Sequence, residues 1–321
     1  MIKREKIIEK IGSKLDRRNS NIVAMYIIIL IFISISTLFG TLLDVILRTR
    51  MLFTTTFGMF SVMQVLFGLS VIDKMILRVI GAVPLDNKNE KSLLEIAQAY
   101  LNEVKQAINL DFDIQLATIE TRSINALSVG RREHTHTIVI TTGALEKLEV
   151  NEIKSLLLHE LYHIVNKDVD YLTTVSGTFG SPLLIFKLSK DRIRKFLKAK
   201  KKGLLKKEEQ RKQLNGIILS WLIMIISSLF IPLSFLSNIF ISVRKEFEAD
   251  SFSATMISKD AVISLLKKAK ENCLSLDTEY IFIRYHFFVQ PNCADINKKT
   301  NSILSTYPSI GERISYIENT Y

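Results

Sequence analysis

Two histidines with the spacing of a metal site stand near the middle of the chain, in the stretch LLLHELYHIVNKD. His159 and His163 are four residues apart, so on a helix they share a face and can direct ring nitrogens at one ion. Glu160 is displaced by one position, which places its carboxylate beside the open coordination site where water binds. A metal makes this water acidic, and the glutamate accepts its proton and passes it to a leaving amine. The pattern predicts a zinc site that hydrolyses peptide bonds.

A buried helix can carry the same pattern by chance, because only three of its five positions are fixed. On that reading the histidines are satisfied core residues and Glu160 is a surface charge. A histidine pair in a transport helix fits poorly, since the segment between Lys154 and Asn166 is too short to cross a bilayer of roughly 30 Å. The choice between metal site and core helix depends on further ligands.

A catalytic zinc needs a third protein ligand. The segment RKEFEADSFSA supplies one candidate, because Glu246 and Asp250 lie one helical turn apart. We expect Glu246 to bind the metal and Asp250 to orient a ligating histidine. The remaining histidine candidates are His134, His136 and His286.

The composition indicates a membrane protein. Of 321 residues, 48% are hydrophobic, and the mean hydropathy is +0.22, which is more apolar than is usual for a soluble chain. The net charge is +11, but the basic residues flank apolar runs, as they do at an anionic membrane surface, so we expect a lipid bilayer and no nucleic acid as partner. The two cysteines form no CxxC pair, which excludes a disulfide scaffold and a cysteine zinc ribbon.

Charge and apolar runs divide the chain into four segments. Residues 1–73 combine a basic N-terminus with two uncharged runs, Ile22–Leu43 and Met51–Ile72, which predict a two-span hairpin with both ends in the cytoplasm. The first run is too long for a signal peptide and lacks a clear cleavage site, so we interpret it as a retained anchor. Residues 74–170 are the first part of a cytoplasmic metalloprotease domain that contains the histidine helix.

The second half of the chain repeats this alternation. Residues 171–241 are a second membrane-associated hairpin, with apolar runs Tyr171–Leu188 and Gly216–Ile241. The basic loop 187–213 between them carries thirteen Lys or Arg against three acidic residues. Residues 242–321 form the second part of the protease domain and supply the third zinc ligand.

The soluble part reads as an α+β domain. The stretch SLLEIAQAYLNEVKQAINL predicts an amphipathic helix with Leu93, Leu94, Ala97, Leu101, Val104 and Ile108 on one face. Three short stretches, DFDIQLATIE, SINALSVGR and THTIVITTGAL, predict strands. The fold class is therefore a multi-pass, mostly helical membrane protein with a small sheet beside the histidine helix.

A shared zinc ion constrains the topology. If His159 and Glu246 bind one ion, the chain between them crosses the bilayer an even number of times, so both apolar runs after the motif span or neither does. Two spans place the basic loop outside, against the positive-inside tendency. No full span requires residues 216–241 to enter and return, and Pro232 offers a bend for this.

Together these motifs resemble the HtpX-like integral-membrane zinc metallopeptidases, relatives of the type I CAAX prenyl proteases. The resemblance covers nearly the whole chain and rests on INALSVGR, ITTGALEKL, HELYHIVNKD and EFEAD, in this order between apolar runs. It implies a gluzincin-like catalytic domain with one zinc ion per chain. His159, His163 and Glu246 would be the zinc ligands and Glu160 the catalytic base.

The resemblance also implies a substrate cleft. The stretch around Asn125 and Ala126 would lie along it, where an edge strand can pair with an extended backbone. STYPSIGERI is similar to a family motif in which a histidine precedes the proline, a position that Tyr307 takes here. The Tyr307 hydroxyl can donate to an oxyanion. The alternative, which we favour, is a tight turn that packs Tyr307 and Pro308 before the last helix.

These features predict a membrane-bound zinc endopeptidase of the cell membrane, with its active site near the cytoplasmic face. The resemblance implies protein or peptide substrates and a role in quality control of misfolded membrane proteins. One alternative is the processing of a specific peptide or lipid-modified protein. Another is a non-catalytic membrane adaptor that keeps the protease fold, but such a scaffold would not need the carboxylate of Glu160.

Overall fold

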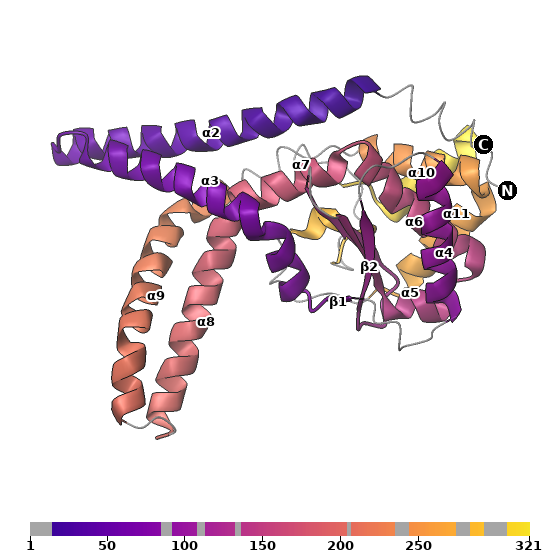
Figure 1. The fold of residues 1–321 in the computed structure, drawn as a ribbon. Coiled ribbons are helices and arrows are strands. Elements are labelled where there is room, and N and C mark those ends of the chain that lie inside the picture. Colours follow the sequence, from indigo (N-terminus) through magenta and orange to yellow (C-terminus); the bar gives the residue numbers. More distant parts are fainter. Residues whose placement is uncertain are drawn as a thin grey trace. The chain divides into compact units, whose positions relative to one another are not determined.

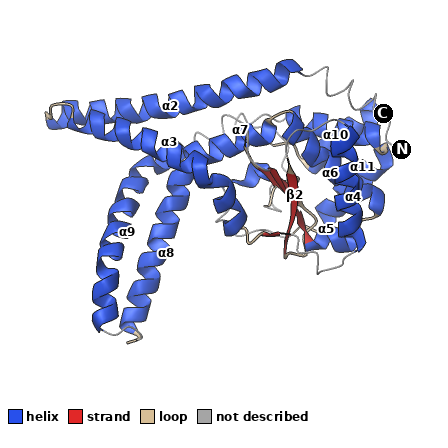
Figure 2. Ribbon diagram, viewed as in Figure 1, coloured by secondary structure: helices blue, strands red, loops and turns tan. Residues whose placement is uncertain are grey.

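A computed structural model describes residues 15–84, 92–107, 113–131, 136–203, 207–234, 244–273, 283–291 and 307–321. Helices dominate these residues, and one small sheet accompanies them (Figure 2). The helices are α2 (Leu15–Leu47), α3 (Leu52–Val79), α4 (Ser92–Ala107), α5 (Thr142–Lys147), α6 (Val150–Val165), α7 (Asp168–Val175), the π-helix η1 (Ser176–Gly180), α8 (Ser181–Lys201), α9 (Lys207–Ser234), α10 (Arg244–Met256), α11 (Lys259–Glu271) and α12 (Ile310–Thr320). The strands are β1 (Val83–Pro84), β2 (Ile114–Ile119), β3 (Ala126–Val129) and β4 (His136–Thr141).

The chain forms two compact units, each built from segments that are distant in sequence. The first unit comprises Met1–Ile27, Ser70–Thr174 and Asn238–Tyr321, and it contains the sheet. The second unit comprises Ile28–Leu69 and Val175–Ser237, and it is helical where the structure describes it.

Three helices are long and apolar enough to cross a membrane, among the residues that the structure describes: Asn19–Leu47, Leu52–Val79 and Glu208–Ile231. The first two contain the uncharged runs that predict the N-terminal hairpin, except Met51, which precedes the second helix. The apolar run Tyr171–Leu188 is divided among α7, η1 and α8, and it forms no candidate span. Gly177 and Gly180 of this apolar run lie in the π-helix, and Lys187 of the run begins the basic part of α8.

A tight turn joins α2 to α3. The carboxylate of Asp44 accepts hydrogen bonds from the backbone N–H groups of Phe53 and Thr54, at 3.0 and 2.8 Å. These N–H groups belong to the first turn of α3 and have no partner within the helix. Gly40 permits the close approach, because a Cβ there would lie 2.5 Å from the Phe53 carbonyl oxygen.

Phenylalanines pack the helices of the second unit together. The ring of Phe230 in α9 lies near those of Phe32, Phe57 and Phe60, with centroids 5.1–6.1 Å apart. Phe179 of η1 meets Phe32 edge-on at 5.2 Å. These contacts bring α9 and η1 onto α2 and α3.

The sheet has the strand order β1-β2-β4-β3. Strands β2 and β4 are parallel, with Leu116 opposite Ile138, and β3 is antiparallel to β4, with Leu127 opposite Val139. The three strands predicted from the sequence are β2, β3 and β4. Strand β1 was not predicted, because a two-residue strand carries no readable alternation.

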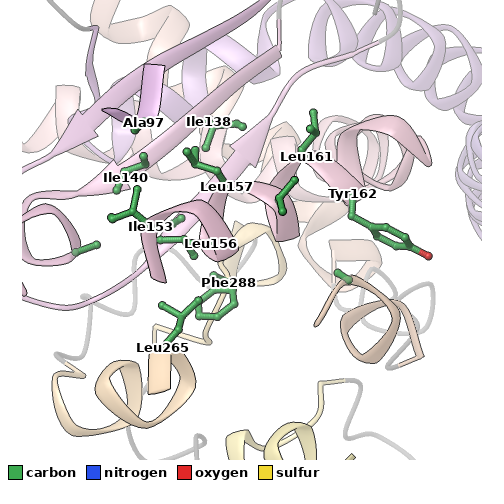
Figure 3. Packing of buried hydrophobic residues seen from close by; sticks show 14 of the residues in the cluster. Ala97, Ile138, Ile140, Ile153, Leu156, Leu157, Leu161, Tyr162, Leu265 and Phe288 are labelled. Carbon is green, nitrogen blue, oxygen red and sulfur yellow. The ribbon is translucent and has the colours of Figure 1, made fainter. Parts of the chain in front are cut away.

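The core of the first unit surrounds α6. Figure 3 shows Ile138 and Ile140 of β4 on one side of this helix and Leu265 and Phe288 on the other. Helix α4 packs on α6 as an amphipathic helix, with Ala97, Leu101 and Val104 buried as predicted, whereas Ile108 lies outside the described residues. The histidine helix is therefore held from several directions.

Candidate metal centre

Helix α6 positions both histidines. A capping box at its start joins Glu149 and Glu152, whose side chain accepts the Glu149 N–H at 2.7 Å. Every residue from Ser155 to Ile164 is buried. Because apolar neighbours fix the helix from both sides, the directions of His159 and His163 are set before any ligand binds.

The structure brings His159, His163 and Glu246 together, and they form the one group of potential ligands found among the described residues. The Nε2 atoms of the two histidines are 3.2 Å apart. Glu246 carboxylate oxygens lie 3.4 Å from Nε2 of His159 and 3.6 Å from Nε2 of His163. A tetrahedral zinc ion with bonds of about 2.0–2.1 Å requires ligand atoms about 3.3–3.4 Å apart. The two ring nitrogens are close to this spacing, and the Glu246 carboxylate presents one oxygen to each of them, so the three residues suit a zinc ion.

Helix α10 supplies Glu246 in its first turn. It packs against α6, where the Ser253 hydroxyl donates to the carbonyl oxygen of Ser155 at 3.0 Å. The ring of Phe252 lies 5.5 Å from that of Tyr162, between centroids. These contacts along the helix fix the position of the glutamate relative to the histidines.

Glu160 lies in the same pocket and is buried. Its Oε2 accepts a hydrogen bond from the hydroxyl of Ser128, in strand β3. Burial raises the pKa of Glu160 above its ordinary value, although both histidines and Ser128 oppose this shift. A carboxyl group with a raised pKa is suited to accept a proton near neutral pH and to return it.

A carboxylate faces the outer nitrogen of each histidine. His163 donates from Nδ1 to Asp168 at 3.1 Å, which leaves its Nε2 for the metal. Nδ1 of His159 lies 3.0 Å from Asp250, although the ring N–H is not well aligned with this oxygen. Asp250 thus lies beside a candidate ligand, and its role in orienting that histidine remains a prediction. Such carboxylates orient the ring and raise its basicity.

Asp168 was missed in the sequence reading. It follows the end of α6, where Lys167 has a positive φ of 62° that turns the chain. The side-chain amide of Asn21 donates to Asp168 at 2.8 Å, and the ammonium of Lys245 lies 2.7 Å away. Burial opposes ionisation, but Lys245 and His163 outweigh it and hold the pKa of Asp168 at about 2. The sequence signal that could have identified Asp168 is its position, five residues after His163.

Arg313 of α12 is a second residue that the sequence reading missed. It is fully buried and donates two hydrogen bonds to Asp250, at 2.6 and 2.7 Å. Burial opposes ionisation of Asp250, but the guanidinium outweighs it and holds the pKa at about 2. Arg313 is the penultimate residue of the motif STYPSIGERI, so its type and place were readable, whereas its partner was not.

Tyr307 points at the proposed ligand Glu246. Its hydroxyl lies 2.9 Å from Oε2 of Glu246 and within 2.9 Å of the carbonyl oxygens of Phe287 and Phe288. Burial and the Glu246 carboxylate raise its pKa well above the ordinary value, so the hydroxyl keeps its proton. Tyr307 does not line the metal pocket. A role toward an oxyanion remains a prediction.

The edge of β3 near Asn125 is paired with the chain itself. The Asn125 amide donates to the carbonyl oxygen of Val289 at 2.8 Å and accepts from its N–H at 3.0 Å. Phe288 donates its N–H to the carbonyl oxygen of Ala126 at 2.8 Å. Pairing of this edge with a substrate remains a prediction, and at these residues it requires the segment around Phe288 to move.

The three other histidine candidates lie in different places relative to the proposed ligands. His136 pairs with Asp170 at 3.0 Å, outside the triad. His286 lines the metal pocket and donates from Nδ1 to the carbonyl oxygen of Ser128 at 3.0 Å. His134 lies outside the described residues.

The pocket at the triad is a small cavity of about 20 Å³. It is lined by Ser128, His159, Glu160, His163, Val169, Leu172, Glu246 and the segment Tyr285–Phe288. A cavity of this size holds about one water molecule. It has room for an ion or a water molecule, and a peptide requires part of the wall to open.

Comparisons with known proteins identify the family of this chain. The model of peptidase family M48 matches residues 88–321. Protease HtpX of Buchnera aphidicola subsp. Schizaphis graminum is 26% identical over 209 residues, 64% of this chain and 66% of that protein. Protease HtpX homolog 2 of Methanosarcina mazei is 29% identical over 208 residues, 64% of this chain and 65% of that protein. These two alignments thus cover just under two thirds of each relative. Protease HtpX of Wigglesworthia glossinidia brevipalpis is 24% identical over 294 residues, 89% of this chain and 94% of that protein.

Proposed function

The chain belongs to peptidase family M48, a family of metallopeptidases, and from this premise we propose that it is a membrane-bound zinc endopeptidase. The observation that carries the proposal is the cluster of His159, His163 and Glu246. Its ring nitrogens lie 3.2 Å from each other, and the two oxygens of the Glu246 carboxylate lie 3.4 Å from one nitrogen and 3.6 Å from the other, close to the spacing of zinc ligands. Buried Glu160 lies beside it. A core helix with two accidental histidines would need neither the carboxylate of Glu246 beside them nor the buried Glu160.

His159, His163 and Glu246 would hold the ion through two imidazole nitrogens and one carboxylate, a donor set found in catalytic zinc sites. When bound, zinc makes a water molecule acidic enough to act as a nucleophile near neutral pH. Asp168 and Asp250 keep the imidazoles in the tautomer that presents Nε2 to the ion.

Glu160 would take a proton from the attacking water and return it to the leaving amine. Its burial and raised pKa suit both steps. Ser128 holds one of its oxygens, so the other is left to face the reacting groups. Strand β3 thereby links the base to the sheet edge beside which we expect the substrate to lie.

The substrates we propose are proteins or peptides, chiefly misfolded membrane proteins, as an extension from the relatives named protease. Three candidate membrane helices support a place in the cell membrane. The cytoplasmic side for the active site follows from the basic N-terminus and the positive-inside tendency. A peptide would reach Glu160 after movement of Tyr285–Phe288, which forms part of the cavity wall.

The test is cleavage by the purified, detergent-solubilised chain, with zinc or with a chelator, of unfolded membrane proteins and of lipid-modified peptides. We expect cleavage with zinc at several unrelated sites, and none with the chelator. Cleavage confined to one peptide or to the lipid-modified substrates would favour a processing protease instead. Zinc binding without cleavage of any substrate would favour the adaptor.

A further inference from the structure

The second unit contains a helical hairpin with an unusual charge distribution. Helices α8 and α9 lie side by side (Figure 1). Residues 187–202, the C-terminal part of α8 and its end, carry nine Lys or Arg and one acidic residue, Asp191. The part of α9 that faces residues 187–195 is uncharged, because α9 carries no charge from Gln213 through its described end, whereas its first six residues, 207–212, are mostly charged.

The basic residues of α8 near Arg192 and the uncharged part of α9 lie at the same level of the hairpin. Arg192 packs on Gly216, where an added Cβ would be 2.7 Å from the Nη2 atom of the guanidinium. Both helices rise about 1.5 Å per residue and run in opposite directions. Lys190 is therefore level with Ile218, and Arg194 with Leu214.

The two helices expose opposite chemistry at this level. Lys190 and Arg194 are exposed at successive turns of α8, whereas Ser189 and Ile193 are buried. On α9 five large apolar side chains are exposed near this level, with 45–56% of their surface accessible: Leu214, Ile218, Leu219, Trp221 and Leu222. Gln213 and Asn215 are exposed beside them. Cations are costly in hydrocarbon, and these apolar groups are unfavourable in water. A membrane interface accommodates both kinds of side chain, because the cations can lie among the headgroups and the apolar groups in the hydrocarbon.

A hollow of about 520 Å³ lies between the helices in this region. Leu188, Phe196 and Ile217 give it apolar walls, and Arg192 and Lys195 give it cations. Asp191 is the one acidic residue of its lining. Its size is in the range of small-molecule sites. Apolar walls next to a pair of cations match a phosphate group attached to acyl chains.

We propose that this hollow binds an anionic phospholipid, and that the charged half of the hairpin lies in the headgroup layer of the membrane. Arg192 and Lys195 contact the lipid phosphate. The acyl chains run along Leu188, Phe196 and Ile217. The charge of the surrounding helix then favours anionic over zwitterionic lipids. This site is independent of proteolysis.

The single tryptophan of the chain offers a direct probe. Trp221 lies one helical turn from Ile217 and is half exposed. The full-length protein is reconstituted in vesicles of phosphatidylcholine and phosphatidylglycerol at one fixed ratio, with bromine atoms on either the neutral or the anionic lipid. The vesicles then differ only in which lipid quenches the fluorescence.

We expect the brominated anionic lipid to quench Trp221 at least twofold more, and high salt to reduce the difference. In the variant Arg192→Gln/Lys195→Gln, both brominated lipids should quench Trp221 equally. The matched control Lys267→Gln/Lys270→Gln removes two exposed charges from α11 and should keep the preference. Thermal unfolding of both variants checks that they fold, and the salt series on the unmodified chain tests the proposal without any substitution.

Equal quenching by the two lipids in the unmodified protein would overturn the proposal, as would a preference that survives in a folded Arg192→Gln/Lys195→Gln variant. Absence of quenching by both lipids would also contradict it. Inorganic phosphate at constant ionic strength should leave the preference intact. If inorganic phosphate abolished the preference for the anionic lipid, the hollow would be a site for free phosphate instead.

Discussion

Arg313 holds Asp250 by two hydrogen bonds of 2.6 and 2.7 Å in the interior of the first unit. The pair joins α12 to α10, and Asp250 in turn lies beside His159. A residue close to the C-terminus thus supports the orientation of a proposed zinc ligand more than 150 positions earlier in the sequence.

Asp250→Asn should weaken both folding and metal binding. The guanidinium of Arg313 stays buried without its charge partner, which costs roughly 3–5 kcal/mol of stability. Loss of the carboxylate beside His159 should lower zinc affinity by about 10–100-fold. Chelator competition and thermal unfolding measure the two effects. Asp260→Asn, at an exposed position of α11, is the control and should change neither by a comparable amount.

Glu246→Gln should remove most of the bound zinc, because the amide keeps the shape of the side chain but loses its charge. Metal analysis of the purified protein should give a stoichiometry far below one ion per chain. Glu248→Gln, on the same helix, should keep its zinc, since Glu248 hydrogen-bonds to Tyr162 rather than facing the triad. Equal zinc content in the two variants would refute the assignment of Glu246.

Tyr307→Phe tests whether the hydroxyl supports Glu246. Removing it leaves the Glu246 carboxylate without a donor at 2.9 Å, so zinc affinity should fall about tenfold. Stability should decrease by about 1 kcal/mol. Tyr316→Phe, at an exposed ring, is the matched control. An unchanged zinc affinity, measured by chelator competition, would show that the hydroxyl serves only the carbonyl groups of Phe287 and Phe288.

His286 should make the metal-free protein sensitive to mild acid. Burial lowers its pKa to about 4, against an unfolded value of 6.5. Between these values the unfolded chain binds more protons, so stability falls as the pH drops from 6.5 to 4, by roughly 1.4 kcal/mol per pKa unit. Above pH 6.5 this group contributes no pH dependence.

Thermal unfolding of the chelated protein across this range gives the measurement. His286→Gln lacks the titrating group, although its amide can still donate to the carbonyl of Ser128. Its melting temperature should therefore fall less steeply with acid. Identical slopes for the two proteins would assign the acid sensitivity to other groups.

The sequence sufficed for the features that are local in the chain. The spacing of His159 and His163 and the one-turn spacing of Glu246 and Asp250 follow from helix geometry alone. Strands β2 and β4 are rich in β-branched residues, and this composition was readable. The predicted division of the chain into four segments stays a prediction.

The features that were missed depend on contacts between distant segments. Ser128 meets Glu160, and Arg313 meets Asp250, only because the sheet and α12 pack against the helices of the site. The closing of the β3 edge by Val289 is of the same kind. No periodicity in a single sequence indicates which distant residue a buried polar group will meet.

The central claim is that Glu160 acts on a water molecule at a zinc ion held by its neighbours. Glu160→Gln separates the two parts of this claim, because Glu160 is not one of the three ligands. Zinc content and cleavage of an unfolded membrane protein should be measured on the same preparation. We predict one zinc ion per chain and cleavage reduced at least 100-fold, in line with the loss of a general base. Undiminished cleavage by this variant would contradict the account.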